Sequence, residues 1–232
     1  LNRLYDTFTK KQVAITYRHD DVYKGPVPQA QTEKLTYLLD KLENRNSVKI
    51  MVYGVSVATG CNASGTEFGG FIAPYMPNAY NIVEAYLEKA YGTEIVVDNK
   101  AVGGWKLSQC LNEYDTRIKG QDIDLMILRI GGNDNITDEY SYKDYLQKLI
   151  GKFFSDYPKS NLIIQTPELP NQQAGIQVNN ITWTGNIAQI DDWTRNVVRE
   201  HEKEGQIAIA DVQAFTNWVE STGKKTRDWL SN

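Results

Sequence analysis

Three stretches of the sequence carry groups that together could perform acyl transfer. Ser56 follows an apolar run at 48–53, Gly104 ends a glycine pair that follows a second apolar run, and Asn133 follows a third. A serine hydroxyl can attack an acyl carbon, and hydrogen-bond donors can stabilise the oxyanion that develops there. Glycine offers its backbone N–H without a Cβ in the way, and an asparagine side chain donates through its NH₂ group. A hydroxyl, a glycine turn and an amide in this order indicate an acyl-transfer site.

These groups can meet only if the apolar runs before them are neighbouring strands of one sheet. The pattern predicts strands at 48–53, 95–97, 125–130, 162–165 and 207–212, and helices at 31–44, 78–91, 105–118, 141–156, 184–204 and 213–220. Strands that are apolar on both faces and alternate with helices indicate a parallel sheet covered on both sides. Ligands of such sheets bind beyond the carboxyl ends of the strands, which is where the three groups stand.

At these positions the chain resembles the SGNH hydrolases, the GDSL-like esterases and lipases, and among them a bacterial carbohydrate-esterase-like branch. Gly-Val-Ser at 54–56 is similar to their Gly-Asp-Ser block. Gly104 lies five residues after Asn99, as in their second block, and Gly-Gly-Asn-Asp at 131–134 matches their Gly-x-Asn-Asp block in full. The resemblance extends from about residue 17 to the end of the chain.

The resemblance implies both a fold and a chemistry. The fold is a flavodoxin-like α/β/α sandwich, with three layers around a five-stranded parallel sheet. The chemistry is the hydrolysis of ester bonds, often of acetyl groups on sugars. Ser56 would be the nucleophile, and the N–H groups of Ser56 and Gly104 together with the side chain of Asn133 would form the oxyanion hole.

The chain departs from the family at two places. Val55 stands where the family has an aspartate that helps organise the turn around the serine, so we expect the backbone there to be less well held. The family's Asp-x-x-His pair follows the fifth strand, whereas this chain ends at Asn232 before such a pair. Of the two histidines, His201 is expected at the opposite end of the sheet, and His19 in an N-terminal arm that could fold over the site. A serine without a base is a poor nucleophile, so we expect this chain alone to be nearly inactive, and active if the natural protein continues to a histidine.

Three side chains near the strand ends admit more than one interpretation. Trp105 could line the acyl pocket or support a sugar ring, or it could pack beneath its loop. Arg129 interrupts an apolar strand and requires a charged partner, for which Asp98 and Asp134 are candidates. Asp211 ends the last strand, where capping a helix or fixing a loop is favoured over assisting a histidine.

Composition argues against several classes of function. The 232 residues suffice for one α/β domain, expected at 31–232 behind an arm at 1–30. A net charge of −4 without a Lys/Arg run argues against nucleic acid. No apolar run approaches the roughly 20 residues of a membrane span, and no His/Cys cluster has the spacing of metal ligands, so neither a metal nor another cofactor is expected. Cys61 and Cys110 are compatible with one disulfide or with two free thiols.

We therefore expect a serine esterase that hydrolyses small acyl esters, chiefly acetyl esters, of a small molecule or glycan. A secreted or cell-surface bacterial location fits this activity, while a cytoplasmic location and the oligomeric state stay open. The alternative is a non-catalytic SGNH-like module that binds a glycan or forms part of a larger protein. A nucleotide-binding domain is disfavoured because the loop after the first strand has neither a Walker motif nor G-x-G-x-x-G. The long loops 57–77 and 168–183 are expected to shape selectivity.

Overall fold

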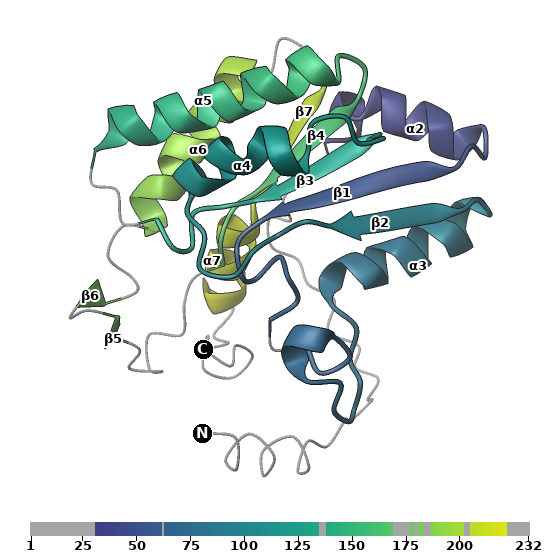
Figure 1. Ribbon diagram of the computed structural model, residues 1–232, viewed down its shortest axis with the longest axis horizontal. Helices are drawn as coiled ribbons and strands as arrows, with labels where there is room; N and C mark the ends of the chain where they lie inside the picture. The colour runs from purple at the N-terminus through teal and green to yellow at the C-terminus, as the bar shows by residue number, and fades with distance from the viewer. Residues whose placement is uncertain are drawn as a thin grey trace.

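The computed structural model contains a five-stranded parallel sheet with helices on both faces (Figure 1). It describes residues 31–61, 63–134, 138–168, 177–178, 181–182, 187–201 and 205–221, so the arm expected at 1–30 lies outside the described residues. The spatial order of the strands is β2 (Ile95–Asn99), β1 (Val48–Gly54), β3 (Leu125–Arg129), β4 (Asn161–Gln165) and β7 (Ile207–Ala210). The predicted fold class, a three-layer α/β/α sandwich, is confirmed.

Helices α4 (Leu107–Arg117), α5 (Glu139–Asp156) and α6 (Ile187–His201) pack on one face of the sheet, and α2 (Thr36–Glu43) and α3 (Ala79–Tyr91) on the other. The alternation of side chains along β1 produces these two cores. Met51 and Tyr53 join the α4–α6 core, whereas Ile50 and Val52 join the α2–α3 core. All four side chains are buried, which is why the stretch 50–53 of β1 is a continuous apolar run in the sequence.

Two predicted boundaries of α3 agree with its caps. The side chain of Asn78 accepts hydrogen bonds from the N–H groups of Tyr80 and Asn81, which have no partner inside the helix. At the other end, Gly92 adopts a left-handed conformation with φ of 66°, which glycine reaches without strain. The last helix of the described ranges, α7 (Val212–Ser221), begins directly after β7.

Beyond small shifts at their ends, such as the last predicted strand, which ends at Ala210 and not at 212, and a 3₁₀ turn (Glu67–Gly69) in the predicted loop 57–77, the predicted elements differ from the structure in two segments. The helix predicted at 31–44 is a 3₁₀ turn (Thr32–Lys34) followed by α2, because the chain bends at Leu35. The segment 168–183, predicted as a loop, contains a small antiparallel hairpin of β5 (Gln177–Val178) and β6 (Ile181–Thr182). Strands of two residues are too short to leave an alternating pattern in the sequence.

A buried carboxylate ties α2 to the end of the sheet opposite the strand ends that carry Ser56 and Asn133. Asp124, immediately before β3, accepts hydrogen bonds from the Tyr37 hydroxyl at 3.1 Å, from Lys41 Nζ at 2.6 Å and from the Lys49 N–H at 2.9 Å. Tyr37 and Lys41 belong to α2, and Lys49 belongs to β1. This Asp124 clasp fixes a helix, a strand and a loop at one point.

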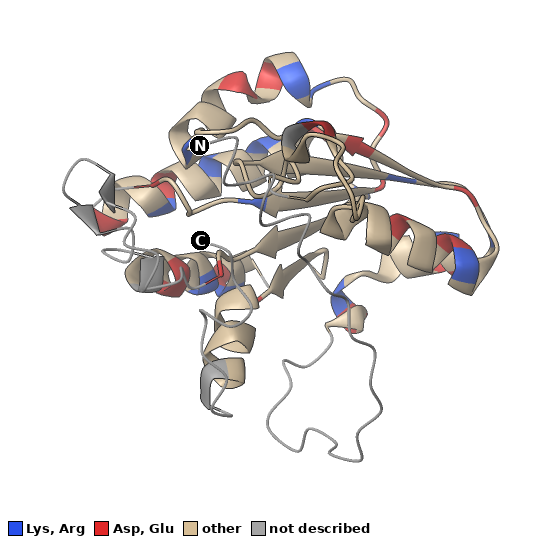
Figure 2. Cartoon of the chain, turned by 90° about the horizontal axis from the view of Figure 1, so that it is seen from below, with Lys and Arg blue, Asp and Glu red and all other residues tan. Residues whose placement is uncertain are grey.

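Acidic and basic residues are interspersed along the described part of the chain in Figure 2. No helix in the described ranges has the length and apolar character that a membrane crossing requires.

Candidate active site

The end of β1 requires a glycine and places Ser56 at the rim of the sheet. Gly54 has φ of +145°, and a Cβ on it would lie 1.9 Å from the carbonyl oxygen of Arg129 on β3. That contact is impossible, so only glycine fits. The Val55 N–H then donates to the same carbonyl at 3.1 Å and continues the pairing past the strand. Ser56 follows at the carboxyl end of the sheet and is partly exposed.

The turn after Ser56 is held without an acidic residue at position 55. The carbonyl oxygen of Ser56 accepts hydrogen bonds from the N–H of Thr59 at 3.1 Å and from its hydroxyl at 2.6 Å. Asn99 Nδ2 donates to the carbonyl oxygen of Ala58 at 2.7 Å. Val55 itself is buried, with 1% of its surface exposed. Thr59 and Asn99 thus hold the backbone that the sequence led us to expect to be less well held.

The loop after β2 lies beside this turn. The Val102 N–H donates to the carbonyl oxygen of Gly54 at 2.9 Å, which extends the contact between the two strands beyond their ends. A Cβ on Gly103 would lie 3.9 Å from the Cβ of Ser56, an ordinary van der Waals distance. Gly104 follows with φ of +79°, is exposed, and has open space where a Cβ would stand. The glycine pair therefore reaches the serine through Gly103 and leaves Gly104 facing open space.

The loop after β3 is fastened to the loop after β2 by two hydrogen bonds. Asn133 Nδ2 donates to the carbonyl oxygen of Trp105 at 2.9 Å. The Leu107 N–H, at the start of α4, donates to Asp134 Oδ1 at 3.0 Å. Burial raises the pKa of Asp134, and the hydrogen bonds from Leu107 and Gly131 oppose that rise. The amide of Asn133 has two hydrogens, and the bond to Trp105 orients the second one.

These contacts bring the three predicted site residues to neighbouring loops at one rim. The glycine pair lies beside Ser56 and is followed by Trp105, whose carbonyl oxygen accepts a hydrogen bond from Asn133. The order of the strands explains this, because β1 lies between β2 and β3 in the sheet. The serine loop thus stands between the two loops that carry the candidate donors.

Trp105 packs under its loop, which is one of the two interpretations that the sequence left open. Its ring meets Tyr53 edge to face with 6.3 Å between centroids, and the Arg117 guanidinium lies 4.7 Å from the ring centroid. The side chain is half-buried against the α4–α6 core. Contact with a substrate stays a prediction for this residue.

The prediction that Arg129 pairs with Asp98 or Asp134 is wrong. Its guanidinium is buried and pairs with Glu168, which follows β4, and it also donates to the Ile130 carbonyl at 3.0 Å. Asp98 instead pairs with Lys100, and Asp134 accepts from backbone N–H groups. The arginine reaches sideways across the sheet to the next strand, and Glu168 stands at the end of that strand.

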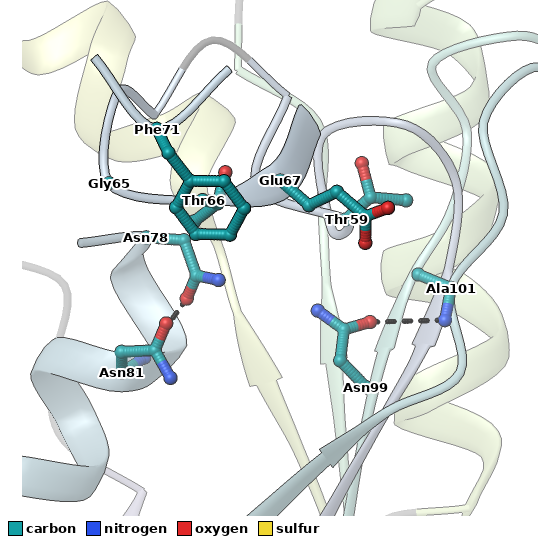
Figure 3. A pocket seen from close by; sticks show the side chains of 9 residues that line it. All are labelled: Thr59, Gly65, Thr66, Glu67, Phe71, Asn78, Asn81, Asn99 and Ala101. Carbon is teal, nitrogen blue, oxygen red and sulfur yellow. Dashed lines mark hydrogen bonds between the residues drawn. The ribbon is translucent and has the colours of Figure 1, made fainter. Parts of the chain in front are cut away.

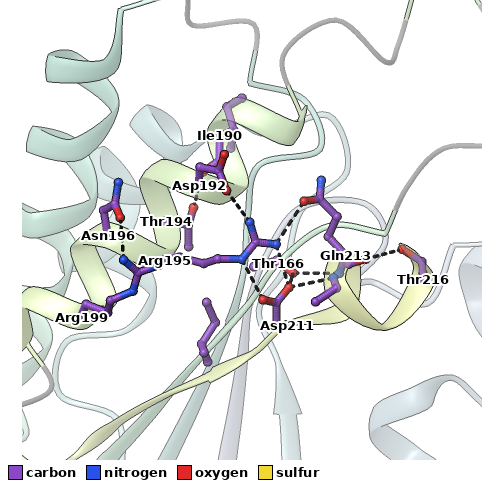
Figure 4. Close-up of polar contacts among 12 residues, drawn as sticks. Thr166, Ile190, Asp192, Thr194, Arg195, Asn196, Arg199, Asp211, Gln213 and Thr216 are labelled. Carbon is purple, nitrogen blue, oxygen red and sulfur yellow. Dashed lines mark hydrogen bonds and ion pairs between the residues drawn. The ribbon is translucent and has the colours of Figure 1, made fainter. Parts of the chain in front are cut away.

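Asp211 holds the start of α7, as expected from its position (Figure 4). Its Oδ1 accepts from the Ala214 N–H at 2.9 Å, and Arg195 on α6 donates to both carboxylate oxygens at 2.7 and 3.0 Å. Burial tends to raise its pKa, but the Arg195 and Ala214 bonds outweigh this and hold the pKa below its usual range. The carboxylate is therefore engaged in structure.

Of the histidines and cysteines in the described ranges, His201 and Cys110 lie on helices, and Cys61 lies in the loop that follows the serine turn. His201 is the last residue of α6, where its Nδ1 lies 3.2 Å from the carbonyl oxygen of Val197. His19 lies outside the described residues. Both cysteines are free thiols: Cys61 is exposed, and Cys110 is buried, which raises its pKa to about 12. Within the described ranges, no group of His, Cys, Asp or Glu is placed to hold a metal.

A pocket of about 300 Å³ lies beside the serine turn (Figure 3), and sequence reasoning did not find it. Thr59 of that turn lines it, together with Asn99 at the end of β2 and residues at the start of α3. Most of its other lining residues come from the loop 57–77. The length of that loop is the signal that pointed to this region.

Comparison with known proteins finds the same fold in solved structures of esterases and lipases. No protein-family model matches the chain, and no curated protein does. Solved structures match most of the chain at low sequence identity. A two-domain esterase active on acetylated mannans, CEX, has a TM-score of 0.60 and 12% identity, and the match covers 85% of this chain and 47% of that protein. This chain therefore spans about half the length of CEX.

Two further solved structures match along most of their own length. A catalytic mutant of Axe2, an acetylxylan esterase from Geobacillus stearothermophilus, has a TM-score of 0.56 and 18% identity, with 79% of this chain and 84% of that chain covered. A lipase/acylhydrolase from Enterococcus faecalis has a TM-score of 0.54 and 15% identity, with 78% and 82% covered. Identities this low establish a shared fold. The chain therefore has the α/β/α fold of the SGNH hydrolases.

Proposed function

We propose that the protein is a serine esterase with Ser56 as its nucleophile and an oxyanion hole formed by the N–H groups of Ser56 and Gly104 and the side chain of Asn133. The observation that carries this proposal is the set of contacts that joins the three loops. Gly103 lies against Ser56, and the Asn133 amide is bonded to Trp105, two residues further along the same loop. Acyl transfer requires hydrogen-bond donors around the attacking hydroxyl, and a serine loop between two loops that carry such donors supports this proposal.

In the proposed reaction, Ser56 Oγ forms a bond to the acyl carbon, and the carbonyl oxygen takes on negative charge. The donors stabilise that oxyanion, the alcohol leaves with a proton, and water then releases the acid from the serine ester. A base must accept the proton of the serine hydroxyl in the first step. In the described ranges the only histidine is His201, at the far end of α6, so the proposal requires a base from outside these residues.

The substrate in this proposal is a small acyl ester, chiefly an acetyl ester, of a carbohydrate. Two proteins of the same fold act on acetylated mannans and acetylated xylan, which supports this choice. The loops at the rim are open enough for a glycan, because Gly104 is exposed and Ser56 is partly exposed. A secreted or cell-surface location follows from such a substrate.

The test is hydrolysis of p-nitrophenyl acetate by the natural-length protein. We expect Ser56→Ala to reduce kcat by about 10³-fold or more, because the nucleophile is lost. Ser155→Ala, at an exposed serine of α5, is the matched control and should keep the rate of the parent. A rate that survives in Ser56→Ala, or no rate in the folded natural-length protein, would refute the esterase.

The second candidate function is a glycan-binding module without catalysis. It is favoured by one observation: within the described ranges, no side chain accepts a hydrogen bond from the Ser56 hydroxyl. Binding of acetylated oligosaccharides without Ser56-dependent release of acetate would support this module. Release of acetate that depends on Ser56 would exclude it.

A further inference from the structure

The pocket beside the serine turn has the features of a binding site for a neutral ring. Its walls come from three places: the loop after β1, the first turn of α3, and the end of β2. At about 300 Å³ it is at the lower end of the volumes found for small-molecule sites. Figure 3 shows the side chains of Phe71 and Glu67 on the loop side, with Asn78 and Asn99 across from them.

The loop wall is closely packed on itself. A Cβ on Gly69 would lie 1.7 Å from the carbonyl oxygen of Ala63, so the two segments of the loop touch through their backbones. The Gly65 N–H donates to the carbonyl oxygen of Met76 at 2.7 Å, and the Ile72 N–H donates to that of Ser64 at 2.8 Å. These bonds close the loop and give the pocket a fixed wall.

Phe71 presents an aromatic ring to solvent at the pocket. Its side chain is 62% exposed, and its backbone has φ of +47°, a conformation that a bulky residue seldom adopts. Such strain costs on the order of 1 kcal/mol and is characteristic of binding sites. The Phe71 N–H donates to the carbonyl oxygen of Thr66 at 3.1 Å, which helps to hold this conformation. An exposed ring held in this way can pack against the C–H face of a ligand ring.

Several polar groups in the pocket are already occupied and serve as its frame. Asn78 Oδ1 accepts two N–H groups of α3, and Asn99 bonds to Ala58 and Ala101 on either side of it. The hydroxyl of Thr66 donates to backbone carbonyl oxygens of its own loop. Their positions are therefore fixed before any ligand arrives.

Other polar groups remain available to a ligand. Asn78 retains its NH₂ group, and Asn81, exposed on the first turn of α3, makes one long side-chain bond of 3.3 Å to Glu84. The carboxylate of Glu67 belongs to an exposed residue and makes no ion pair or hydrogen bond within the described residues. The lining thus offers amides, one carboxylate and one aromatic ring, and its only charge is negative. This combination favours a neutral ring with several hydroxyl groups and repels anions.

The pocket is connected to Ser56 by hydrogen bonds. Thr59, which lines the pocket, bonds to the carbonyl oxygen of Ser56 through both its N–H and its hydroxyl. We propose that this pocket binds an uncharged sugar ring of the glycan whose ester group reaches Ser56. The proposal rests on the esterase function for the role of that ester, but the binding of the sugar ring does not depend on catalysis.

The experiment measures binding of unacetylated oligosaccharides, so that no reaction takes part. Xylotetraose, mannotetraose and cellotetraose are titrated into the natural-length protein and its Ser56→Ala variant by calorimetry, with tetragalacturonic acid as the anionic probe. We expect at least one neutral sugar to bind both proteins equally well and the anionic sugar to bind more weakly. Phe71→Gly should raise Kd by about 10-fold, which corresponds to a loss of roughly 1.4 kcal/mol of ring packing.

The choice of Phe71→Gly keeps the experiment decisive, because glycine adopts a positive φ without strain and the loop retains its shape. Asn81→Ala is the second variant and should also raise Kd. Tyr140→Ala is the matched control, at a 78% exposed aromatic residue on α5 outside the pocket, and should leave Kd unchanged. Glu67→Gln should strengthen binding of the anionic sugar relative to the neutral ones.

Two results would overturn the subsite: no binding of any neutral sugar at millimolar concentration, or binding that Phe71→Gly and Asn81→Ala leave unchanged. Failure of the esterase proposal looks different. In that case the neutral sugars bind and the two substitutions weaken that binding, yet no release of acetate depends on Ser56.

Discussion

Asn133 makes one bond that shapes the site and offers another to a reacting substrate. Its Nδ2 holds the carbonyl oxygen of Trp105 at 2.9 Å, which couples the loops after β2 and β3. Because an NH₂ group has two hydrogens, the same nitrogen can also donate to an oxyanion. Structure and the proposed catalysis therefore depend on one side chain, and a substitution should affect both.

We expect Asn133→Ala to lower kcat toward p-nitrophenyl acetate by about 10²- to 10³-fold, as loss of one oxyanion donor does. The lost bond to Trp105 should also reduce the free energy of unfolding by about 1 kcal/mol in urea titrations. Asn44→Ala, which removes a bond to the Asp40 carbonyl at the exposed end of α2, is the control for stability alone. An unchanged kcat in folded Asn133→Ala would remove this residue from the oxyanion hole.

A substitution of Gly54 tests how closely the backbones of β1 and β3 pack. Gly54→Ala would place a Cβ 1.9 Å from the Arg129 carbonyl oxygen, so the two central strands would have to separate. We expect a loss of about 3 kcal/mol or more in the free energy of unfolding. Gly151→Ala, in an exposed part of α5 with open space around it, should instead stabilise the protein by about 0.5–1 kcal/mol. Equal effects of the two substitutions would contradict this account of the β1 end.

At the residue scale the sequence predicted positions better than partners. Ser56, Gly104 and Asn133 could be placed at one rim because strand ends are visible as the ends of apolar runs. The pairing of Arg129 with Glu168 could not be predicted, because it depends on which strand lies next to β3. The hydrogen bond from the Thr59 hydroxyl to the carbonyl oxygen of Ser56 could not be predicted either, because it depends on the geometry of a single turn.

At the scale of elements, α6 carries an unusual buried charge. Asp191 is fully buried, and within the described ranges neither of its carboxylate oxygens has a hydrogen-bond partner. Burial raises its pKa to about 8, while the Arg195 and Arg129 side chains nearby oppose that rise and Asp211 and Asp192 add to it. The folded protein therefore holds a proton that the unfolded chain releases near pH 4.

The consequence is a stability that falls as pH rises. The contribution of the protonated Asp191 is complete below about pH 4 and is lost progressively as pH rises through about 8, because only the unfolded chain has given up the proton over that range. Asp191→Asn keeps the group neutral at every pH. We expect its melting temperature to exceed that of the parent by a margin that grows from pH 5 to pH 8, to roughly 3 °C or more.

Differential scanning calorimetry at several pH values measures this margin. Asp192→Asn is the matched control, because Asp192 is the next residue, is 72% exposed and forms a surface pair with Arg195. Surface pairs contribute about 0–1 kcal/mol, so this variant should follow the pH profile of the parent. A margin for Asp191→Asn that is the same at pH 5 and pH 8 would contradict the assigned cause.

The helices and strands themselves were largely predictable. The helix expected at 78–91 is α3 (Ala79–Tyr91), because Asn78 marks its start and Gly92 its end. The final helix, expected at 213–220, is α7 (Val212–Ser221). The prediction was wrong where elements are only two or three residues long, as in the β5–β6 hairpin, since periodicity needs several residues to become visible.

At the scale of the whole molecule, stability and the proposed chemistry lie at opposite ends of the sheet. The Asp124 clasp joins α2, β1 and the start of β3 at one end, while the loops of Ser56 and Asn133 lie at the other. A parallel sheet imposes this division, because all carboxyl ends of the strands gather at one edge.

We therefore expect Asp124→Ala to lower the free energy of unfolding by about 2–3 kcal/mol, because it leaves Lys41 and the Lys49 N–H without their buried partner. The kcat toward p-nitrophenyl acetate should stay unchanged at temperatures where the variant is folded. Asp122→Ala, which removes a pair with Lys49 between exposed side chains, should cost less than about 1 kcal/mol. A marked loss of kcat in folded Asp124→Ala would show that the two ends are coupled.

The global arrangement could be predicted in class but not in detail. Alternating helices and strands that are apolar on both faces require a covered parallel sheet, and the structure has one. The order β2-β1-β3-β4-β7 came only with the structure, as did the pocket. That pocket combines Thr59, Asn78 and Asn99 from three separate elements, and no local pattern in the sequence connects them.

The exposure of Cys61 gives this protein a single chemically addressable thiol. Cys110, the other cysteine, is buried with a pKa raised to about 12, so a maleimide reagent at neutral pH should modify Cys61 alone. Cys61 lies between Thr59 and Thr66, in the loop that joins the serine turn to the pocket wall. An environment-sensitive dye attached there would turn the unmutated chain into an optical reporter, whose emission follows sugar binding in real time.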